Sequence, residues 1–343
     1  MRRSIIAGSL CLLFACGGDK TDEDMLPIPA DAPPLIGERF ALTYGPVTIQ
    51  PGQEGTRCIW LRLSNAEPIK VRQIHNVLSS SSHHLIVYKD DMDTTEQLTP
   101  VDCQPFTGAL NATGMIAPMM ITQKADDTLT LPDGVAYTLA PHQMIKIEMH
   151  YVNAGDAPMD ATATVDFYRA DEALIKHEAN ILFIGSPDID IAPGASLRLN
   201  QFFTFPSYLD MSAAKIFAIT GHTHHFGTDM QVRTGPSKTG PMRTVYAPQP
   251  FSWSEPETTT HVPEFSVPTG GGFDFECSYT NTGTQQVGFG ESAGDEMCFF
   301  WAYYYPSQGS KVCVHTEQYG GVNGLNVCCP GDPTICDLLS NMF

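Results

Sequence analysis

Short segments with alternating apolar and polar residues recur along the chain from residue 37 onward. In the clearest, residues 144–150 read MIKIEMH, the period-two pattern of a strand that is buried on one face. Similar runs between turn residues lie at 40–44, 58–63, 85–88, 163–168, 181–184, 196–205, 215–220, 230–234, 272–279 and 297–305. Almost no stretch keeps a 3.6-residue period, so we predict an all-β chain with at most brief helical turns at 205–209 and 211–214.

The length and the turn residues extend this prediction to an architecture. A chain of 343 residues suggests about two domains, and its 29 Gly and 26 Pro supply the turns that many short strands need. Strands at this spacing are typical of sandwiches. We predict two tandem antiparallel jelly-roll-like β-sandwich domains at 37–185 and 186–318, with the joint near 185–188 or 192–194. A Cys-rich, disulfide-stapled tail would follow at 319–343.

The N-terminus has the order of a secretory signal. A doubly charged start, MRR, precedes an apolar run at 5–14 that is too short to span a bilayer as a helix. The following LFAC at 13–16 resembles a bacterial lipobox. We therefore predict a signal peptide at 1–15, lipidation of Cys16 and a flexible tether at 16–36. An ordinary signal peptide with an incidental cysteine is the alternative.

The cysteine count and the charge agree with export. Of ten Cys, Cys11 would leave with the signal and Cys16 would carry the lipid, so eight remain for disulfides in an oxidising compartment. A net charge of −19 excludes nucleic-acid binding by phosphate neutralisation, which needs a basic surface. The predicted membrane contact is the lipid anchor alone. Because Gly17 follows the cysteine where Asp would retain a lipoprotein at the inner membrane, we expect the outer membrane or the cell surface.

Two histidine groups in the first half have the character of metal ligands. His83 and His84 are adjacent, and adjacent side chains of a regular strand point to opposite faces, so both reach one ion only at a strand end or bulge. The serine run at 80–82 allows such an irregular entry. His150 ends the alternating strand. The alternatives are an exposed pair at a loop end and a structural strand histidine.

Two further groups lie in the second half. His222 and His224 are separated by two positions, so they share one face of a strand and can converge on one ion, whereas His225 points away. Met297 is a soft donor that favours Cu(I), although methionine is more often core filler. Neighbouring Cys298 could be a thiolate ligand, but the even cysteine count favours a disulfide.

In this order, the four groups resemble the copper type II, ascorbate-dependent monooxygenases, the family of dopamine β-monooxygenase and peptidylglycine α-hydroxylating monooxygenase. The resemblance covers about residues 37–318 and implies two copper ions. The electron-transfer ion would be held by His83, His84 and His150. The oxygen-activating ion would be held by His222, His224 and Met297. The family also implies the disulfides Cys58–Cys103 and Cys277–Cys298, and leaves the pairing of Cys313, Cys328, Cys329 and Cys336 open.

The implied activity is hydroxylation of a C–H bond with O2, with ascorbate or a similar one-electron donor as co-substrate. Two positions depart from the family pattern. Thr220 stands where peptide-amidating members carry an Arg that would grip a carboxylate bidentately, and Trp301 stands where Tyr is usual. Peptidylglycine is therefore not the expected substrate, the organic substrate stays unassigned, and Thr220 and Trp301 are the positions expected to contact it. The groups expected to orient the imidazoles are Glu148, Asp229 and Glu296.

Two other functions remain open at this point. A non-catalytic copper-binding or copper-sequestering cell-surface lipoprotein would keep both sites without turnover. A metal-free adhesion or scaffold sandwich would bind no stoichiometric copper. The sequence identifies no protein partner and no oligomeric state.

Overall fold

The structure is a computed structural model that describes residues 34–80, 82–105, 115–292, 294–318, 324–332 and 336. The strands all lie in one compact unit that begins at Leu35. The predicted all-β class is confirmed, because nearly every element of the described chain is a strand and the short 3-10 helix η1 (Glu172–Leu174) is the exception. The segments 205–209 and 211–214, where at most brief helical turns were predicted, each contain one hydrogen-bonded turn, because segments this short cannot propagate a helix.

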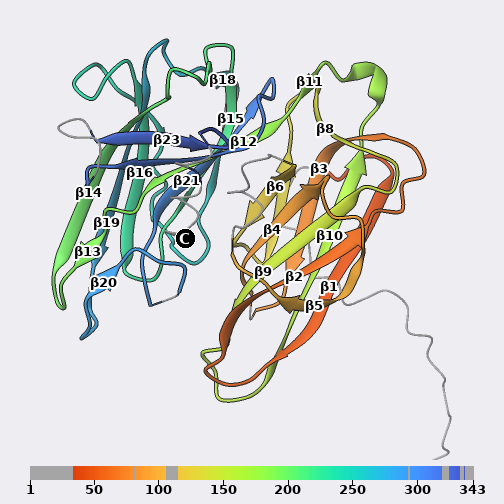
Figure 1. The fold of residues 1–343 in the computed structure, drawn as a ribbon, viewed down its shortest axis with the longest axis horizontal. Helices are drawn as coiled ribbons and strands as arrows, with labels where there is room; N and C mark the ends of the chain where they lie inside the picture. The colour runs from red at the N-terminus through yellow and green to blue at the C-terminus, as the bar shows by residue number, and fades with distance from the viewer. Residues whose placement is uncertain are drawn as a thin grey trace, which may run out of the picture. The chain divides into compact units, whose positions relative to one another are not determined.

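Strands β1 to β11 build the first sandwich (Figure 1). Their bounds are β1 (Arg39–Ile49), β2 (Glu54–Arg62), β3 (Ile69–Leu78), β4 (Ser82–Asp90), β5 (Gln97–Asp102), β6 (Ile116–Thr122), β7 (Asp126–Thr130), β8 (Val135–Leu139), β9 (Met144–Val152), β10 (Met159–Arg169) and β11 (His177–Glu178). One sheet has the order β1-β10-β3-β8-β11, with β7 paired to β3, and the other has the order β5-β2-β9-β4-β6. The apolar residues of both sheets share one core.

Strands β12 to β23 build the second sandwich. Their bounds are β12 (Asn180–Ser186), β13 (Asp190–Ile191), β14 (Ser196–Thr204), β15 (Lys215–His222), β16 (Gly227–Gly235), β17 (Arg243–Tyr246), β18 (Thr258–Phe265), β19 (Gly272–Thr280), β20 (Val287–Gly288), β21 (Cys298–Tyr305), β22 (Lys311–Thr316) and β23 (Leu325–Cys329). Its sheets have the orders β18-β15-β21-β12-β22-β23 and β14-β19-β16-β17. Pairing is antiparallel except between β8 and β11 and between β12 and β22.

The chain changes from one sandwich to the other between β11 and β12. Strand β11 pairs with β8 of the first sandwich, whereas β12 pairs with β21 of the second along its whole length. The change therefore comes before the loop at 185–188 that the turn residues suggested. A single buried residue, Ala179, separates the two strands, so this crossing carries no Gly or Pro signal in the sequence.

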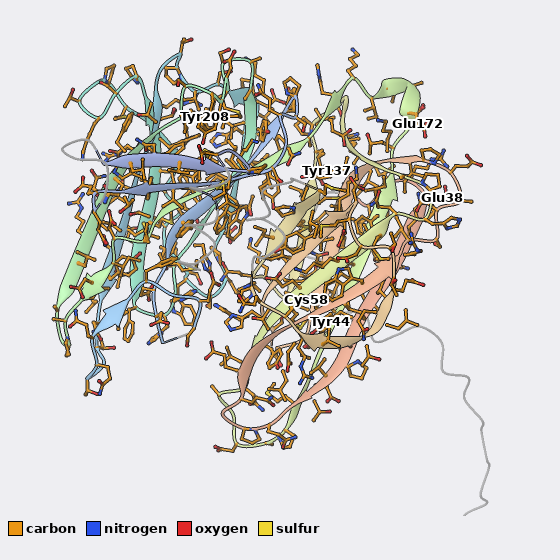
Figure 2. The ribbon with its side chains drawn as sticks, in the orientation of Figure 1. Glu38, Tyr44, Cys58, Tyr137, Glu172 and Tyr208 are labelled. Carbon is orange, nitrogen blue, oxygen red and sulfur yellow. A yellow bond between two sulfur atoms is a disulfide. The ribbon has the colours of Figure 1, made fainter. Side chains whose placement is uncertain are left out.

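All eight cysteines that remain after Cys16 are paired. The disulfides Cys58–Cys103 and Cys277–Cys298 are present, and Cys313 pairs with Cys328 and Cys329 with Cys336. Cys328 and Cys329 lie on β23, which is hydrogen-bonded to β22, so this part of the tail is an edge strand of the second sandwich and not an appendage. The hydroxyl of Tyr208, labelled in Figure 2, also donates to the Cys328 carbonyl at 2.9 Å.

One face of the β15–β21–β12 sheet packs against the first sandwich. Phe217, Phe299, Trp301 and Tyr303 belong to the same buried apolar cluster as residues of the first core, while the alternate positions of these strands face the second core. The backbone N–H of Ile121 donates to the Tyr303 hydroxyl at 3.2 Å across this contact. Directly opposite residues of antiparallel strands share a face, so the pairings of β15 with β21 fix which side chains reach the first sandwich.

Candidate metal centre

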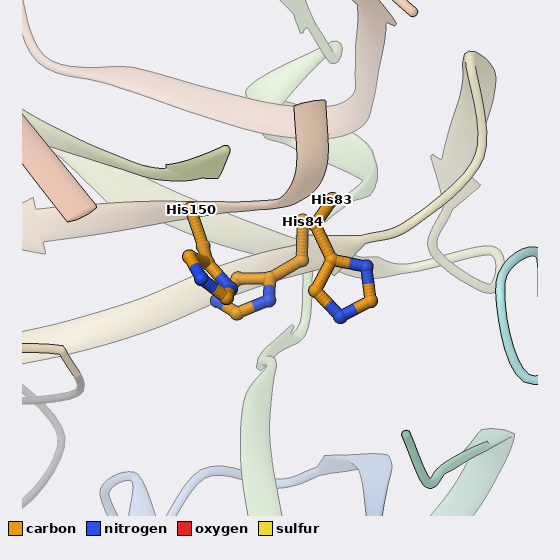
Figure 3. Close-up of side chains that lie close together, drawn as sticks. All are labelled: His83, His84 and His150. Carbon is orange, nitrogen blue, oxygen red and sulfur yellow. The ribbon is translucent and has the colours of Figure 1, made fainter. Parts of the chain in front are cut away.

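Three histidines of the first sandwich converge at the ends of two paired strands. His84 on β4 lies directly opposite His150 on β9, and the register shifts between Ser82 and His84. This irregularity satisfies the condition under which adjacent histidines can reach one point. One ring nitrogen from each of His83, His84 and His150 lies within 4.8 Å of the others (Figure 3). The separation suits a shared metal ion.

The surroundings keep the imidazoles of His83 and His84 neutral. Burial, with lesser repulsion from His150 and His224, lowers the pKa of His83 to about 3. Burial also lowers the pKa of His84 well below its usual value, and again the neighbouring histidines add to the effect. Neutral imidazole is the form that binds a metal, so no proton has to leave these two rings before binding at neutral pH.

Glu54 fixes the orientation of His150. Its Oε1 lies 3.1 Å from Nε2 of His150, so a neutral His150 donates Nε2–H to the carboxylate and leaves Nδ1 for the cluster. A carboxylate on the far nitrogen of a histidine is a common support for a metal ligand. Glu54 begins β2, far from the histidines in sequence, and no local motif marks it.

The second group lies where β15 ends and the chain turns into β16. The rings of His222 and His224 have centroids 5.1 Å apart. Nδ1 of His224 lies 3.0 Å from the Asp295 carbonyl, and Nδ1 of His222 lies 2.9 Å from Oε1 of Gln123. Nε2 of His222 is buried and has no hydrogen-bond partner among the described residues. In both rings Nδ1 is the nitrogen that has a hydrogen-bond partner, so Nε2 points away from that partner.

A buried carboxyl group holds this turn in place. Glu296 accepts the backbone N–H groups of His224 at 2.8 Å and Phe226 at 2.6 Å. Burial raises the pKa of Glu296 to about 7, although these backbone donors act in the opposite direction. Of the three groups expected to orient the imidazoles, Glu296 is the one that contacts the histidine segment.

Met297 lies immediately before β21, at the same sheet edge as the histidine pair. Its side chain is fully buried, and its carbonyl accepts the Tyr279 hydroxyl at 2.7 Å. Two residues further on, Phe299 pairs with His222. The start of β21 thus brings the predicted thioether ligand close to His222 and His224 in the fold.

The five histidines form one cluster. Ring centroids are separated by 5.8 Å between His83 and His224 and by 6.3 Å between His84 and His222. These separations across the two sandwiches are close to the 5.0 Å and 5.1 Å found within each group. The histidine sets of the two sandwiches therefore lie side by side, because the packed aromatic face brings the two strand ends together.

A cavity of about 560 Å³ lies beside the cluster. It is lined by Ser80, Ser82, His83, Val152, Ala154, His224, His225, Trp253 and Gly294. One ligand candidate from each sandwich, His83 and His224, thus reaches its wall. The Trp253 ring lies 6.1 Å from the His83 ring and 6.2 Å from the His225 ring. Cavities of this size hold small organic molecules.

The comparison with known families agrees with this geometry. Residues 178–323 match the model of the copper type II ascorbate-dependent monooxygenase, C-terminal domain. The second sandwich is therefore a domain of the copper type II ascorbate-dependent monooxygenase family. The matched segment begins at β11, spans the second sandwich through β22 and contains His222, His224 and Met297.

Two solved structures that resemble this chain do so only weakly. An infectious bursal disease virus Gx strain structure is 11% identical over 79% of this chain and 72% of that chain, with a TM-score of 0.16. A Gt strain structure of the same virus is 11% identical over 82% and 76%, with a TM-score of 0.14. Scores this low indicate neither a shared fold nor a shared function.

The two residues expected at the substrate lie inside a sheet of the second sandwich. Thr220 is buried and its hydroxyl is 2.8 Å from that of Thr258. Trp301 pairs with Thr220, stacks on Phe183 and lies 6.0 Å from the His222 ring. Neither residue lines the cavity beside the histidine cluster in this structure.

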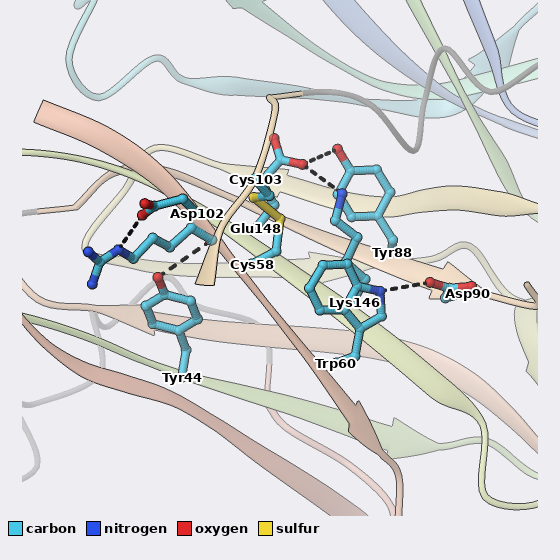
Figure 4. The surroundings of a disulfide bond; sticks show 10 residues. Tyr44, Cys58, Trp60, Tyr88, Asp90, Asp102, Cys103, Lys146 and Glu148 are labelled. Carbon is cyan, nitrogen blue, oxygen red and sulfur yellow. Dashed lines mark hydrogen bonds and ion pairs between the residues drawn. A yellow bond between two sulfur atoms is a disulfide. The ribbon is translucent and has the colours of Figure 1, made fainter. Parts of the chain in front are cut away.

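The two other candidates form hydrogen bonds with residues other than histidine. Glu148 accepts hydrogen bonds from Tyr88 and Lys146, both at 3.1 Å (Figure 4). Asp229 accepts from Gln249 at 3.2 Å on the surface. Sequence reasoning missed Glu54, Gln123 and Trp253, because each reaches the cluster through tertiary structure and none lies in a histidine motif.

Proposed function

We propose that this chain is a copper-dependent monooxygenase that hydroxylates a C–H bond of an organic substrate with O2 and a one-electron donor such as ascorbate. The observation that carries the proposal is the meeting of two buried histidine sets, from two sandwiches, at the wall of one cavity. Family membership supplies the reaction type, and the cavity supplies a place for a substrate next to both sets.

The donor atoms suit copper in both oxidation states. Imidazole binds Cu(II) and Cu(I), and a thioether favours Cu(I). His83, His84 and His150 would hold one ion, and His222, His224 and Met297 would hold the other. Two bound Cu(I) ions would supply the two electrons needed to insert one oxygen atom into a C–H bond.

The protein contributes orientation and shielding from water. Glu54 and the Asp295 carbonyl hold His150 and His224 by their outer nitrogens, so the opposite nitrogens face the cluster. The aromatic face beneath His222 is buried, which keeps bulk water from that side. On the cavity side, His225 and Trp253 supply ring surfaces against which an organic substrate can pack.

The proposal is tested by oxygen incorporation. The protein is loaded anaerobically with two equivalents of Cu(I) and given ascorbate, ¹⁸O₂ and a panel of organic substrates, while O2 uptake is recorded. We expect a hydroxylated product that carries ¹⁸O and depends on both His84 and His222. Bound copper without turnover for any substrate would support the copper-sequestering alternative, and absence of stoichiometric copper would support a metal-free scaffold.

We also propose that the chain is exported and anchored through a lipid on Cys16. The support is the sequence alone, because Cys16 lies outside the described residues. Among the residues that are described, no helix is long and apolar enough to cross a membrane. Cells that express the protein should incorporate labelled palmitate into it, and Cys16→Ala should abolish the label. Equal labelling of both proteins would contradict the anchor.

A further inference from the structure

Gln123 connects the two sandwiches at a predicted copper ligand. It follows β6 of the first sandwich and is itself buried. Its Oε1 lies 2.9 Å from Nδ1 of His222 in the second sandwich. Its Nε2 lies 3.4 Å from the backbone carbonyl of Trp253, the residue that lines the cavity. One amide therefore touches both the ligand and the wall of the cavity.

The partners of this amide decide how its atoms are arranged. A backbone carbonyl only accepts hydrogen bonds, so the NH₂ group of Gln123 must face Trp253 and Oε1 must face His222. Oε1 also only accepts, so the ring nitrogen opposite it must carry the proton. A neutral imidazole has a single N–H. Hydrogen bonding at Nδ1 therefore leaves Nε2 of His222 as an unprotonated donor atom.

The other side of the ring agrees with this arrangement. Nε2 of His222 is buried with no hydrogen-bond partner among the described residues, which is costly for a polar atom unless it has a ligand. The Trp301 ring, 6.0 Å from the His222 ring, supplies no acceptor that could favour the other tautomer. The ring thus has one polar contact that selects its tautomer, and that contact comes from the opposite sandwich.

We propose that Gln123 is a positioning residue that selects the Nδ1–H tautomer of His222 and so presents Nε2 to the second copper site. The inference about the metal rests on the proposed function, whereas the inference about the tautomer does not. Separation of the sandwiches would remove the acceptor. The tautomer of His222 that can bind copper through Nε2 therefore depends on contact between the two sandwiches.

A neighbouring contact provides a matched control. Lys124 and Glu257 form an ion pair of 2.9 Å that also joins the two sandwiches, and 26% and 65% of their side chains are exposed. Among the described residues, neither side chain forms a hydrogen bond with a histidine ring. Lys124→Met removes this cross-sandwich contact and leaves Gln123 in place. Gln123→Leu removes the acceptor at similar volume, and Gln123→Glu keeps an acceptor oxygen.

The first measurement uses metal-free protein with ¹⁵N-labelled histidine. Nitrogen–proton correlation spectra distinguish the two tautomers, and His222→Gln identifies the His222 signals by their loss. We expect Nδ1–H in the wild type, in Lys124→Met and in Gln123→Glu, and a shift toward Nε2–H in Gln123→Leu. An Nε2–H tautomer in the wild type would overturn the proposal, and this reading holds even if Gln123→Leu does not fold.

The second measurement is the Cu(I) affinity of each site, by competition with a chelator. Loss of an outer partner of a ligating histidine typically weakens metal binding about 10–100-fold. We expect a weakening of that size at the second site of Gln123→Leu, none at the first site, and recovery in Gln123→Glu. Unchanged affinity and tautomer in Gln123→Leu would refute the proposal. If the wild type binds no copper, the proposed function fails while the tautomer result still decides the role of Gln123.

Discussion

Three histidines of the cluster each have one ring nitrogen against a different kind of acceptor. His150 has the carboxylate of Glu54, His222 has the amide of Gln123, and His224 has the Asp295 backbone carbonyl. An acceptor on one nitrogen fixes the tautomer and raises the basicity of the other. The negative charge of Glu54 makes His150 the strongest donor of the three, which suits a site that must hold copper through changes of oxidation state.

Met297 is tested best by a substitution that keeps its volume. Its side chain is fully buried in the core, so Met297→Ala would add a cavity cost of about 2–5 kcal/mol to any loss of a ligand. Met297→Leu should change the free energy of unfolding by less than about 1.5 kcal/mol and remove the thioether. We expect one copper ion instead of two, by elemental analysis, and no turnover. Two tightly bound ions in Met297→Leu would exclude the thioether as a ligand.

Glu291 gives the metal-free protein a pH-dependent stability. Burial, with a further contribution from Glu148, raises the pKa of Glu291 from 4.5 to about 8. Between these values the folded protein keeps a proton that the unfolded chain releases, so stability should fall as pH rises from about 4.5 to 8. Glu291→Gln should flatten this profile and exceed the wild type in stability at pH 9 but not at pH 4.

Urea unfolding midpoints at pH 4, 6 and 9 measure this effect. Replacement of the exposed Glu255 by Gln is the control and should leave the profile unchanged. If the stability of Glu291→Gln depends on pH in the same way as that of the wild type, the Glu291 carboxyl group is not the source of the pH dependence.

At the scale of the strands, alternation in the sequence predicted most of the elements near the site. The MIKIEMH run is β9, and the histidines at i and i+2 lie where β15 ends. Strands such as β3 and β6 were missed, although β3 begins with the alternating run IKVR. The supporting residues Glu54 and Gln123 were missed for another reason. Each contacts a histidine more than 90 residues away, and no local pattern encodes such a pairing.

The disulfide Cys277–Cys298 links β19 to the start of β21, next to Met297. Its cysteines are 21 residues apart, and loop-closure entropy for such a loop is worth about 3 kcal/mol. Replacement of both by Ala should lower the free energy of unfolding by about that amount. Because Met297 lies immediately before β21, we expect loss of this disulfide to weaken copper binding at the second site and to leave binding at the first site unchanged.

The disulfide Cys329–Cys336 provides the comparison, since its cysteines are only 7 residues apart. Its removal should destabilise the protein less and leave both copper affinities unchanged. Equal loss of affinity at both sites after removal of Cys277–Cys298 would point to general unfolding, and the proposed link between β21 and the second site would then fail.

At the scale of the molecule, the two sandwiches form one site because they share a buried surface. The aromatic residues of β21 enter the core cluster of the first sandwich, and the ends of β4, β9 and β15 meet at its edge. The sequence indicated two domains with one histidine set each. It could not indicate their contact, because that depends on which face of the second sandwich turns toward the first.

The central claim is that two histidine sets, one on each sandwich, bind two copper ions. Native mass spectrometry of the Cu(I)-loaded protein tests it directly, with His84→Ala and His222→Ala as paired variants. We expect a mass increase of two copper ions for the wild type and of one for each variant. A wild type that binds a single ion, or variants that both retain two, would contradict the account.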